Sequence, residues 1–233
     1  LWAHMVEHRT NRRINLLDTE LVGKVSHFPL KTWLSGRQYV NFSDADPEAS
    51  FPVSLLALLA ERLDIPDLRR LGVLDLEHHN RFRQSEITWA LGNLAWGLDP
   101  DETSFVPNRH DWYSEMQWMI SRYEPENPDG LVVAVKGGHN DEMHNQNDVG
   151  AIIVHVDGES VIADSGRGRY TRQYFHPDLR YTFFVNQSFA HSTPVPNSQQ
   201  QGVGEHYAAK VLEHFHTEAR DMLVLDLKAA YPP

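Results

Sequence analysis

The sequence has no cysteine and comparatively little positive charge. The lack of cysteine excludes disulfide bridges, thiolate metal sites and a cysteine nucleophile, but it leaves the compartment open. Lysine and arginine total 21 against 32 aspartates and glutamates, which gives a formal net charge of -11. Nucleic-acid binding is therefore a poor candidate, because counterion release needs clustered basic residues. The same charge repels a polyanionic substrate at long range, so binding one requires a local basic cluster.

Long apolar runs are also missing. No stretch approaches the roughly 18 apolar residues of a membrane span, and no signal peptide is visible, so we expect no membrane insertion. The chain starts at Leu1 rather than at a methionine and stops at Pro233 in mid-pattern, which is typical of a mature or truncated fragment. Hydrophobic residues still make up 41% of the 233 residues, which is enough for a packed core.

Two kinds of pattern divide the chain into residues 1–114 and 115–233. Within the first part, residues 51–63 and 83–98 place apolar side chains three to four positions apart, as on one face of a helix. Residues 16–46 are rich in turn formers and indicate irregular structure. The first part is therefore predicted to be a helical domain.

The second part alternates short apolar runs with turn signals. Runs that predict strands occupy residues 116–123, 131–136, 181–189 and 222–228. Residues 149–164 predict two strands joined at Asp157-Gly158, a strong two-residue hairpin signal. Strands that follow one another this closely favour antiparallel pairing, and hence a β-sandwich.

The densest polar segment is GGHNDEMHNQNDVG, residues 137–150, between two apolar strands. A loop held at both ends by strands is where binding groups are usually displayed. Asp164 ends the following hairpin and His191 follows a later apolar run, so both could converge with Gln146 of the loop. A carboxylate, an imidazole and an amide oxygen can hold a divalent metal, with Zn²⁺ the usual occupant. The alternative is a solvated loop in which Asn and Asp form turns.

Three segments of the chain resemble the heparinase II/III-like polysaccharide lyases. HNDEMHNQNDVGAIIVHVDGESVIADSG resembles the family's hallmark, a histidine motif before a hairpin that ends in a metal-binding aspartate. SFAHSTPVPNSQQQG resembles the segment with the last metal histidine, and RQYVNFSDAD resembles an Asn-Phe-x-Asp turn late in the family's helical toroid. The resemblance implies an α+β fold. Residues 1–114 would be the C-terminal helices of an α/α toroid, and residues 115–233 the start of an incomplete antiparallel β-sandwich.

The resemblance also implies roles for single residues. His144 matches the catalytic histidine, while Gln146, Asp164 and His191 match the metal ligands, which implies zinc as the cofactor. Many relatives carry histidine at the first ligand position, so Gln146 is a departure from the pattern. Asp148 completes the motif as a structural residue.

The implied reaction is β-elimination at a uronic acid unit of an acidic polysaccharide. The substrate carboxylate must be neutralised, a base must remove the C5 proton and an acid must protonate the leaving O4. His144 would serve as the base or would polarise the carboxylate, and the metal would brace its loop. The tyrosine acid and the carboxylate-neutralising Asn or His belong upstream of this chain. Neither Tyr39 nor Tyr113 sits in a matching motif, so we expect the fragment alone to be inactive.

Substrate-binding residues are expected in and near GRGRYTRQYF. Arg167, Arg169 and Arg172 could hold carboxylate or sulfate groups, Tyr170 could stack on a sugar, and His139 could line the same cleft. The alternative is a hairpin loop with ordinary ion pairs. By resemblance we expect an acidic polysaccharide or oligosaccharide partner, a chain able to form a homodimer, and a periplasmic or extracellular location. Six histidines that belong to no recognised group of candidate site residues are assigned to the surface: His4, His8, His78, His79, His214 and His216.

Other functions remain open at this point. A noncatalytic carbohydrate-binding or structural β-sandwich could keep the metal loop as a staple. A non-haem iron oxygenase would use His139 and Asp141 with a distant histidine. A glycoside hydrolase would use a carboxylate pair such as Glu142 and Asp148.

Overall fold

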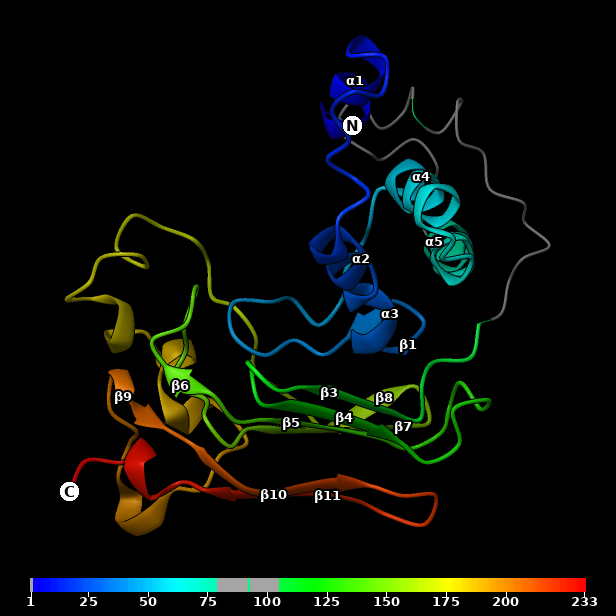
Figure 1. Ribbon diagram of the computed structural model, residues 1–233. Coiled ribbons are helices and arrows are strands. Elements are labelled where there is room, and N and C mark those ends of the chain that lie inside the picture. Colours follow the sequence, from blue (N-terminus) through cyan, green and yellow to red (C-terminus); the bar gives the residue numbers. More distant parts are fainter. Residues whose placement is uncertain (1, 79–91, 93–104) are drawn as a thin grey trace. The chain divides into compact units, whose positions relative to one another are not determined.

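The computed structural model of the chain (Figure 1) describes residues 2–78, 92 and 105–233. Contacts divide the chain into two compact units, residues 1–37 with 49–107, and residues 38–48 with 108–233. The helix expected at 83–98 lies outside the described residues, apart from position 92. None of the helices in the described part of the chain has the length and apolar character needed to cross a membrane.

The first unit is helical. Its elements are α1 (Trp2–Arg9), α2 (Glu20–Ser26), α3 (Phe28–Thr32), β1 (Trp33–Ser35), α4 (Val53–Leu63) and α5 (Asp67–His78). The helix predicted at 51–63 is confirmed as α4, which begins after Pro52 and ends at Asp64 in the left-handed conformation, with φ of 54°. Buried Leu56 and Ala57 lie on α4, and Leu68 and Leu71 supply the buried side chains of the adjacent α5.

The irregular structure expected for residues 16–46 is confirmed for residues 40–46 and wrong for most of residues 20–39. The segment contains α2 and α3, and Thr19 caps α2 by accepting a hydrogen bond from the Val22 amide at 3.2 Å. Helices of five and seven residues span fewer than two turns, so they show too little periodicity to be recognised in the sequence.

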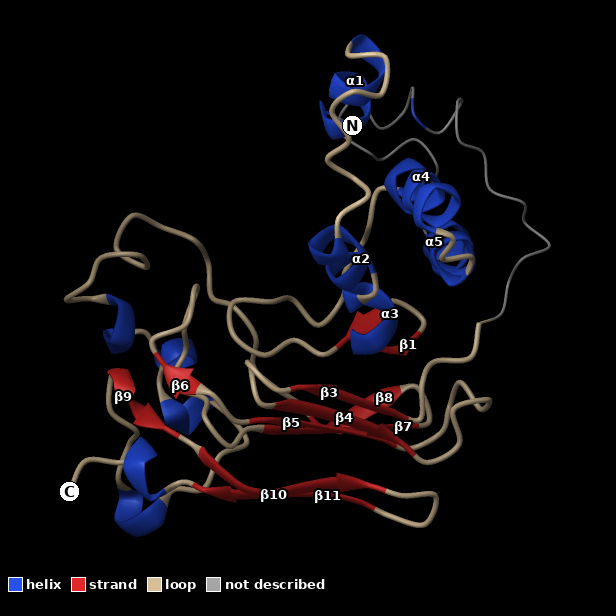
Figure 2. Ribbon diagram, viewed as in Figure 1, coloured by secondary structure: helices blue, strands red, loops and turns tan. Residues whose placement is uncertain are grey.

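The second unit is built on antiparallel strands (Figure 2). Its strands are β2 (Gln38–Tyr39), β3 (His110–Tyr113), β4 (Trp118–Arg122), β5 (Val132–Lys136), β6 (His139–Asn140), β7 (Ile152–Val156), β8 (Glu159–Ile162), β9 (Gly204–Ala208), β10 (Lys210–His216) and β11 (Asp221–Asp226). A five-stranded sheet has the order β3-β4-β5-β7-β8. Because β3 pairs with β4 along its whole length, the division between the units precedes residue 110 rather than following residue 114.

The hairpin signal at Asp157-Gly158 is confirmed as the turn between β7 and β8. Both turn residues have positive φ, 55° and 77°, as a two-residue turn of this kind requires. The strands predicted at 116–123 and 131–136 are confirmed as β4 and β5, and the run at 222–228 forms β11.

The hairpin of β10 and β11 runs alongside the five-stranded sheet (Figure 1). Ser121 of β4 donates a hydrogen bond to Asp221 of β11, which ties the two layers at one end. At the other end Val149, at the close of the polar loop, packs with Ala209, Ala230 and Leu227. The base of the loop is thereby anchored in a core.

The strand predicted at 181–189 is wrong. These residues form three short 3-10 helices, η1 (Arg180–Thr182), η2 (Phe184–Asn186) and η3 (Ser188–Ala190). Two further turns of this type are η4 (Pro196–Ser198) and η5 (Lys228–Ala230). Asn186 and Ser188 are fully buried, and their side chains accept hydrogen bonds from other segments. Side-chain hydrogen bonds, rather than the backbone pairing of a sheet, therefore hold this stretch in place.

Candidate metal and substrate site

The polar loop of residues 137–150 is mostly interior rather than solvated. Residues 145–148 are all buried, and Asp148 and Gln146 have no exposed surface. The base of the loop is closed by two backbone hydrogen bonds, from Lys136 to Ala151 at 2.9 Å and from Gly150 to Lys136 at 2.8 Å. Several buried polar side chains of the loop form hydrogen bonds to other segments, which restricts the conformation of the loop.

Asp164 and His191 lie together beneath this loop. His191 Nδ1 is 2.8 Å from Asp164 Oδ2, and both side chains are completely buried. The second imidazole nitrogen, Nε2, lies 3.0 Å from the carbonyl of Val185, which can only accept. Burial lowers the pKa of His191, but the hydrogen bond and charge of Asp164 outweigh it, so its pKa is raised above the ordinary value. A proton and a metal ion therefore compete for Nδ1.

Gln146 lies against the turn that follows Asp164. Its amide nitrogen donates to the Gly166 carbonyl and to Asp44 Oδ1, each at 3.1 Å, and the Gly166 amide donates to Asp164 Oδ1 at 2.8 Å. The other amide atom, Gln146 Oε1, is buried and has no hydrogen-bond partner among the residues that the structure describes. Gln146 and Asp164 thus contact the same residue, Gly166, and an amide oxygen, a carboxylate and an imidazole are a donor set that suits a divalent metal.

Asp148 has a ligand atom within 4.8 Å of those of Asp164 and His191. Its carboxylate is, however, paired with the fully buried Lys136 ammonium at 2.5 Å, and Glu142 pairs with the same ammonium at 3.2 Å. Burial lowers the pKa of Lys136, and the two carboxylates raise it beyond its ordinary value. Two carboxylates that share one ammonium form a structural ion cluster, which opposes the glycoside-hydrolase interpretation of this pair.

His144 stands at the surface end of the loop. Its side chain is half exposed, and its backbone has a positive φ of 57°. Nδ1 lies 3.2 Å from Asp44 Oδ2 and 3.3 Å from the Tyr170 hydroxyl, and Phe175 packs edge-on against the ring at 5.6 Å between centroids. The ring is held through one nitrogen. Within the described residues no hydrogen bond engages the other nitrogen, Nε2.

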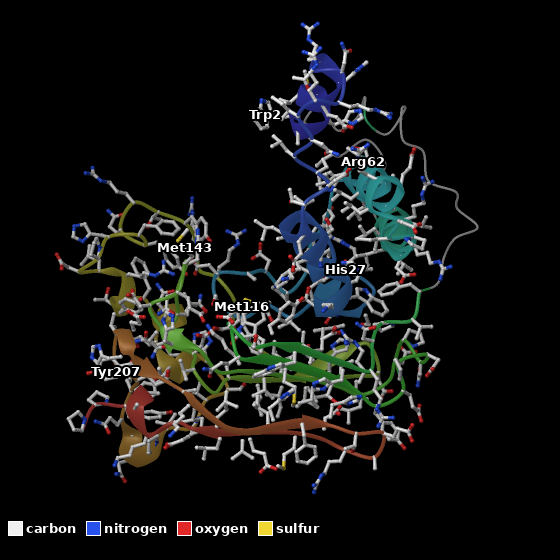
Figure 3. All side chains as sticks on the ribbon, viewed as in Figure 1. Trp2, His27, Arg62, Met116, Met143 and Tyr207 are labelled. Atoms are coloured by element: carbon white, nitrogen blue, oxygen red, sulfur yellow. The ribbon has the colours of Figure 1, made fainter. Side chains whose placement is uncertain are left out.

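A cavity of about 490 Å³ opens beside His144. Met143, 89% exposed, stands at its rim (Figure 3). Its lining comprises Asp141, Glu142, Met143, His144, Asn145, Phe175, Pro177, Arg180, Tyr181 and Val203. The loop thus presents the predicted catalytic histidine to an open, mixed polar and aromatic hollow.

The predicted basic cluster is only partly available. Arg167 forms two hydrogen bonds to Asp46, at 2.9 and 2.7 Å, and its guanidinium lies over the Tyr170 ring at 5.0 Å. Arg169 and Arg172 are exposed. Among the described residues, the alternative of ordinary ion pairing thus applies to Arg167, the first of the three arginines.

His139 and Asp141 do not form a metal pair. His139 lies on β6, and its Nδ1 accepts a hydrogen bond from the Asp141 backbone amide at 3.2 Å. Among the described residues, neither belongs to a group of three side chains that could hold a metal. An iron-oxygenase triad at these positions is therefore not supported.

Sequence reasoning missed the residues that hold this site in place. The Asp44 carboxylate accepts from the Tyr174 hydroxyl at 2.5 Å and from Arg180 at 3.0 Å, besides Gln146 and His144. Asp44 lies in RQYVNFSDAD, the segment that resembled a family turn, which was the one available signal. Arg180 directly precedes the stretch predicted as a strand, residues 181–189, so its inward side chain was not foreseen.

Comparison of the fold with solved structures identifies two large enzymes that resemble the chain. Against a crystal structure of heparan sulfate lyase HepC from Pedobacter heparinus, the TM-score is 0.61 at 14% identity, with 95% of this chain and 31% of that chain covered. Against heparinase III the TM-score is 0.63 at 16% identity, with 97% and 33% covered. The chain has a heparinase-like fold.

These similarities concern the fold alone, because the identities are low. The chain spans about a third of the length of the two heparinase structures. Neither a protein-family model nor a curated protein sequence matches it. The architecture is α+β, with helices and antiparallel sheets, and the enzymes of the same fold are polysaccharide lyases by name.

Proposed function

We propose that the chain carries the loop-borne half of the active site of a polysaccharide lyase that cleaves a uronic-acid polymer by β-elimination. The observation that carries the proposal is the placement of His144. One ring nitrogen is held against Asp44 at 3.2 Å, and the half-exposed ring borders a cavity of about 490 Å³. The heparinase-like fold supports the same reaction class. In this proposal the first unit contains the end of an α/α toroid and the second unit is the start of its β-sandwich.

In the elimination, a base takes the C5 proton, the C–H electrons form the C4–C5 double bond, and the C4–O4 bond breaks. His144 Nε2 would accept the proton when Nδ1 donates to Asp44, because the neutral imidazole then has its lone pair on Nε2. Asp44 is a positioning residue that also stabilises the imidazolium that forms. The acid that protonates O4 is not assigned to a residue of this chain.

A divalent ion, zinc by its donor set, would be held by Gln146, Asp164 and His191. When bound, it would supply a fixed charge that fastens the loop to the turn after β8. In this role the ion would position His144 through its loop rather than contact the substrate. This assignment rests on the close Asp164–His191 pair, and on the buried Gln146 Oε1, which has no hydrogen-bond partner among the described residues.

Acidic sugar groups would bind the exposed arginines. Arg169 and Arg172 are not engaged by carboxylates in the described structure, whereas Arg167 already pairs with Asp46. We expect Arg169→Ala and Arg172→Ala each to weaken binding of uronate oligosaccharides to this chain several-fold, and Arg167→Ala to have a smaller effect. Isothermal titration of the three variants measures the difference. Equal losses in all three would show that the Asp46 pair opens for substrate.

The reaction itself is tested in the full-length protein on a panel of uronate polysaccharides, by ultraviolet absorbance of the unsaturated product. We expect His144→Gln to lower the rate of product formation by a factor of about 10²–10⁴, the usual contribution of a general base. His206→Gln, a change at an exposed histidine on β9, is the matched control. Oligosaccharide binding without elimination, in wild type as well as variant, would instead favour a noncatalytic, metal-stapled carbohydrate-binding β-sandwich.

A further inference from the structure

A second polar cluster lies where the β10–β11 hairpin meets the five-stranded sheet. His110 is on β3, His214 and His216 are on β10, and Asp221 is on β11. His214 and His216 share one face of β10 because they are two residues apart. Asp221 is the cross-strand partner of His216, so its side chain lies on the same face. Three histidines and one carboxylate therefore gather between the layers.

The contacts within the cluster are close. His110 Nε2 lies 3.0 Å from His214 Nε2, and His110 Nδ1 lies 3.6 Å from Asp221 Oδ1. The same Asp221 oxygen contacts His216 Nδ1, and Asp221 Oδ2 accepts a hydrogen bond from Ser121. Ligand atoms of His110, His216 and Asp221 all lie within 4.8 Å of one another.

One atom of this cluster is unsatisfied. The His110 side chain is 9% exposed, and its buried Nδ1 has no hydrogen-bond partner within the described part of the chain. The separation of 3.6 Å from Asp221 is too long for a hydrogen bond. If His110 Nε2 carries the proton and donates to His214, the Nδ1 lone pair faces a carboxylate oxygen, an arrangement that a cation between them would stabilise.

The spacing of His110 and Asp221 suits a zinc ion. Zinc bonds imidazole nitrogen and carboxylate oxygen at about 2.0–2.1 Å in a tetrahedron, which puts neighbouring ligand atoms about 3.3–3.4 Å apart. The His110–Asp221 separation is close to this value. His214 would then fix the tautomer of His110 from behind, as the outer partners of metal-bound histidines do.

We propose that His110, His216 and Asp221 form a zinc site, separate from the loop site, that clamps the β10–β11 hairpin to β3. The fourth position is open to water. The rings of His110 and His216 are stacked at 4.6 Å between centroids, so binding requires one ring to turn. His216 is the ring that turns, since its side chain is 41% exposed and His110 is buried.

Elemental mass spectrometry after dialysis against a zinc buffer tests this site on the full chain. Because loading of the loop site is a separate question, the measured quantity is the difference between variants. We expect His216→Gln to bind one zinc ion fewer than wild type, and His206→Gln to match wild type. In an Asp164→Asn background, which removes the loop site, His216→Gln should still lose one ion. Equal zinc content in wild type and His216→Gln would overturn the proposal.

A second measurement separates a metal clamp from a hydrogen-bonded cluster. Amide hydrogen exchange of β10 and β11 is compared with and without zinc, in the chain carrying Asp164→Asn. We expect zinc to slow exchange in the hairpin of this chain and to have no effect once His216→Gln is added. Both forms should have the same circular dichroism without zinc, since His216 is exposed. Exchange rates in the hairpin that do not change with zinc, or that zinc lowers equally in both forms, would contradict the clamp.

Discussion

Asp44 is nearly buried, with a side chain 2% exposed, and it receives hydrogen bonds from residues far apart in the chain. Its partners are His144, Gln146, Tyr174 and Arg180. A carboxylate in this position neutralises the Arg180 guanidinium and orients the imidazole at once. Removing it would leave a largely buried cation without its counter-ion, and breaking a buried ion pair in this way is strongly destabilising.

We therefore expect Asp44→Ala to lower the free energy of unfolding by about 3–5 kcal/mol, the usual cost of breaking a buried pair. Asp46→Ala is the matched control, because Asp46 and Arg167 are 51% and 38% exposed and such surface pairs contribute roughly 0–1 kcal/mol. Urea unfolding followed by tryptophan fluorescence measures both. Similar losses for the two variants would mean that Asp44 is not the centre of this network.

His191 makes the stability of the fold depend on pH, and the direction of this dependence differs between the metal-free and the metal-bound chain. Its pKa is raised by Asp164 despite burial, so in the metal-free chain the pair stabilises the fold at low pH. That stability is fully present below the ordinary histidine pKa of about 6.5 and is lost as pH rises through the raised pKa of the folded state.

In the presence of a chelator, the stability difference between wild type and His191→Gln should shrink as pH rises. With zinc present, the difference should grow with pH instead, because zinc needs the deprotonated Nδ1. Unfolding curves at pH values on either side of the histidine range measure both cases. The same pH trend with and without zinc would exclude His191 as a ligand.

Turns rather than strands set the geometry of the site. Gly158 in the β7–β8 turn and Gly166 in the turn after Asp164 both have positive φ, 77° and 62°. A Cβ at Gly158 would approach only Asp129, at 3.8 Å, whereas one at Gly166 would lie 2.6 Å from the Ala45 carbonyl oxygen. Substitutions at the two glycines can therefore distinguish the cost of an unfavourable backbone conformation from the cost of a close contact with neighbouring backbone.

Gly158→Ala should destabilise the fold by about 1 kcal/mol, for backbone conformation alone. Gly166→Ala should cost about 1–3 kcal/mol more, because it also overpacks the contact with residue 45 and pushes on the turn that meets Gln146. Thermal or urea unfolding gives both values. If Gly158→Ala were the costlier change, the close packing of residues 45 and 166 would be refuted. Zinc content of Gly166→Ala should fall, and that of Gly158→Ala should not.

On the scale of the whole molecule, a net charge of -11 repels any acidic substrate. Positive charge in the second unit has to offset this repulsion locally. Arg167 and Arg180 are already neutralised by Asp46 and Asp44. Metal ions would add positive charge among buried carboxylates and stabilise the fold by mass action. Ligands that bind only the folded state add about 2.7 kcal/mol at a concentration of about 100 times Kd.

Zinc added at saturation should accordingly raise the melting temperature of the wild-type chain, and a chelator should reverse the change. Asp164→Asn should lose the part that comes from the loop site, and His216→Gln the part from the hairpin site. Differential scanning calorimetry of the two single variants and the double variant measures whether the losses add, as expected for separate sites. A wild-type melting temperature that does not change with zinc would contradict both proposed sites.

The sequence by itself determined the features that depend on neighbouring residues. Apolar spacing in 53–63 was sufficient for α4, and Asp157-Gly158 for a hairpin whose two turn residues need positive φ. The polar loop between two apolar strands was recognisable for the same reason. Local conformational preferences act over a few residues, and these elements are only a few residues long.

Tertiary structure alone decided which distant side chains meet. Asp44 contacts Arg180 across 136 residues, and His110 contacts His214 across 104. His214 and His216 therefore looked like surface residues, although a nearby strand brings His110 to them. No local preference encodes such pairings, because they arise only when strand order and register place separate segments side by side.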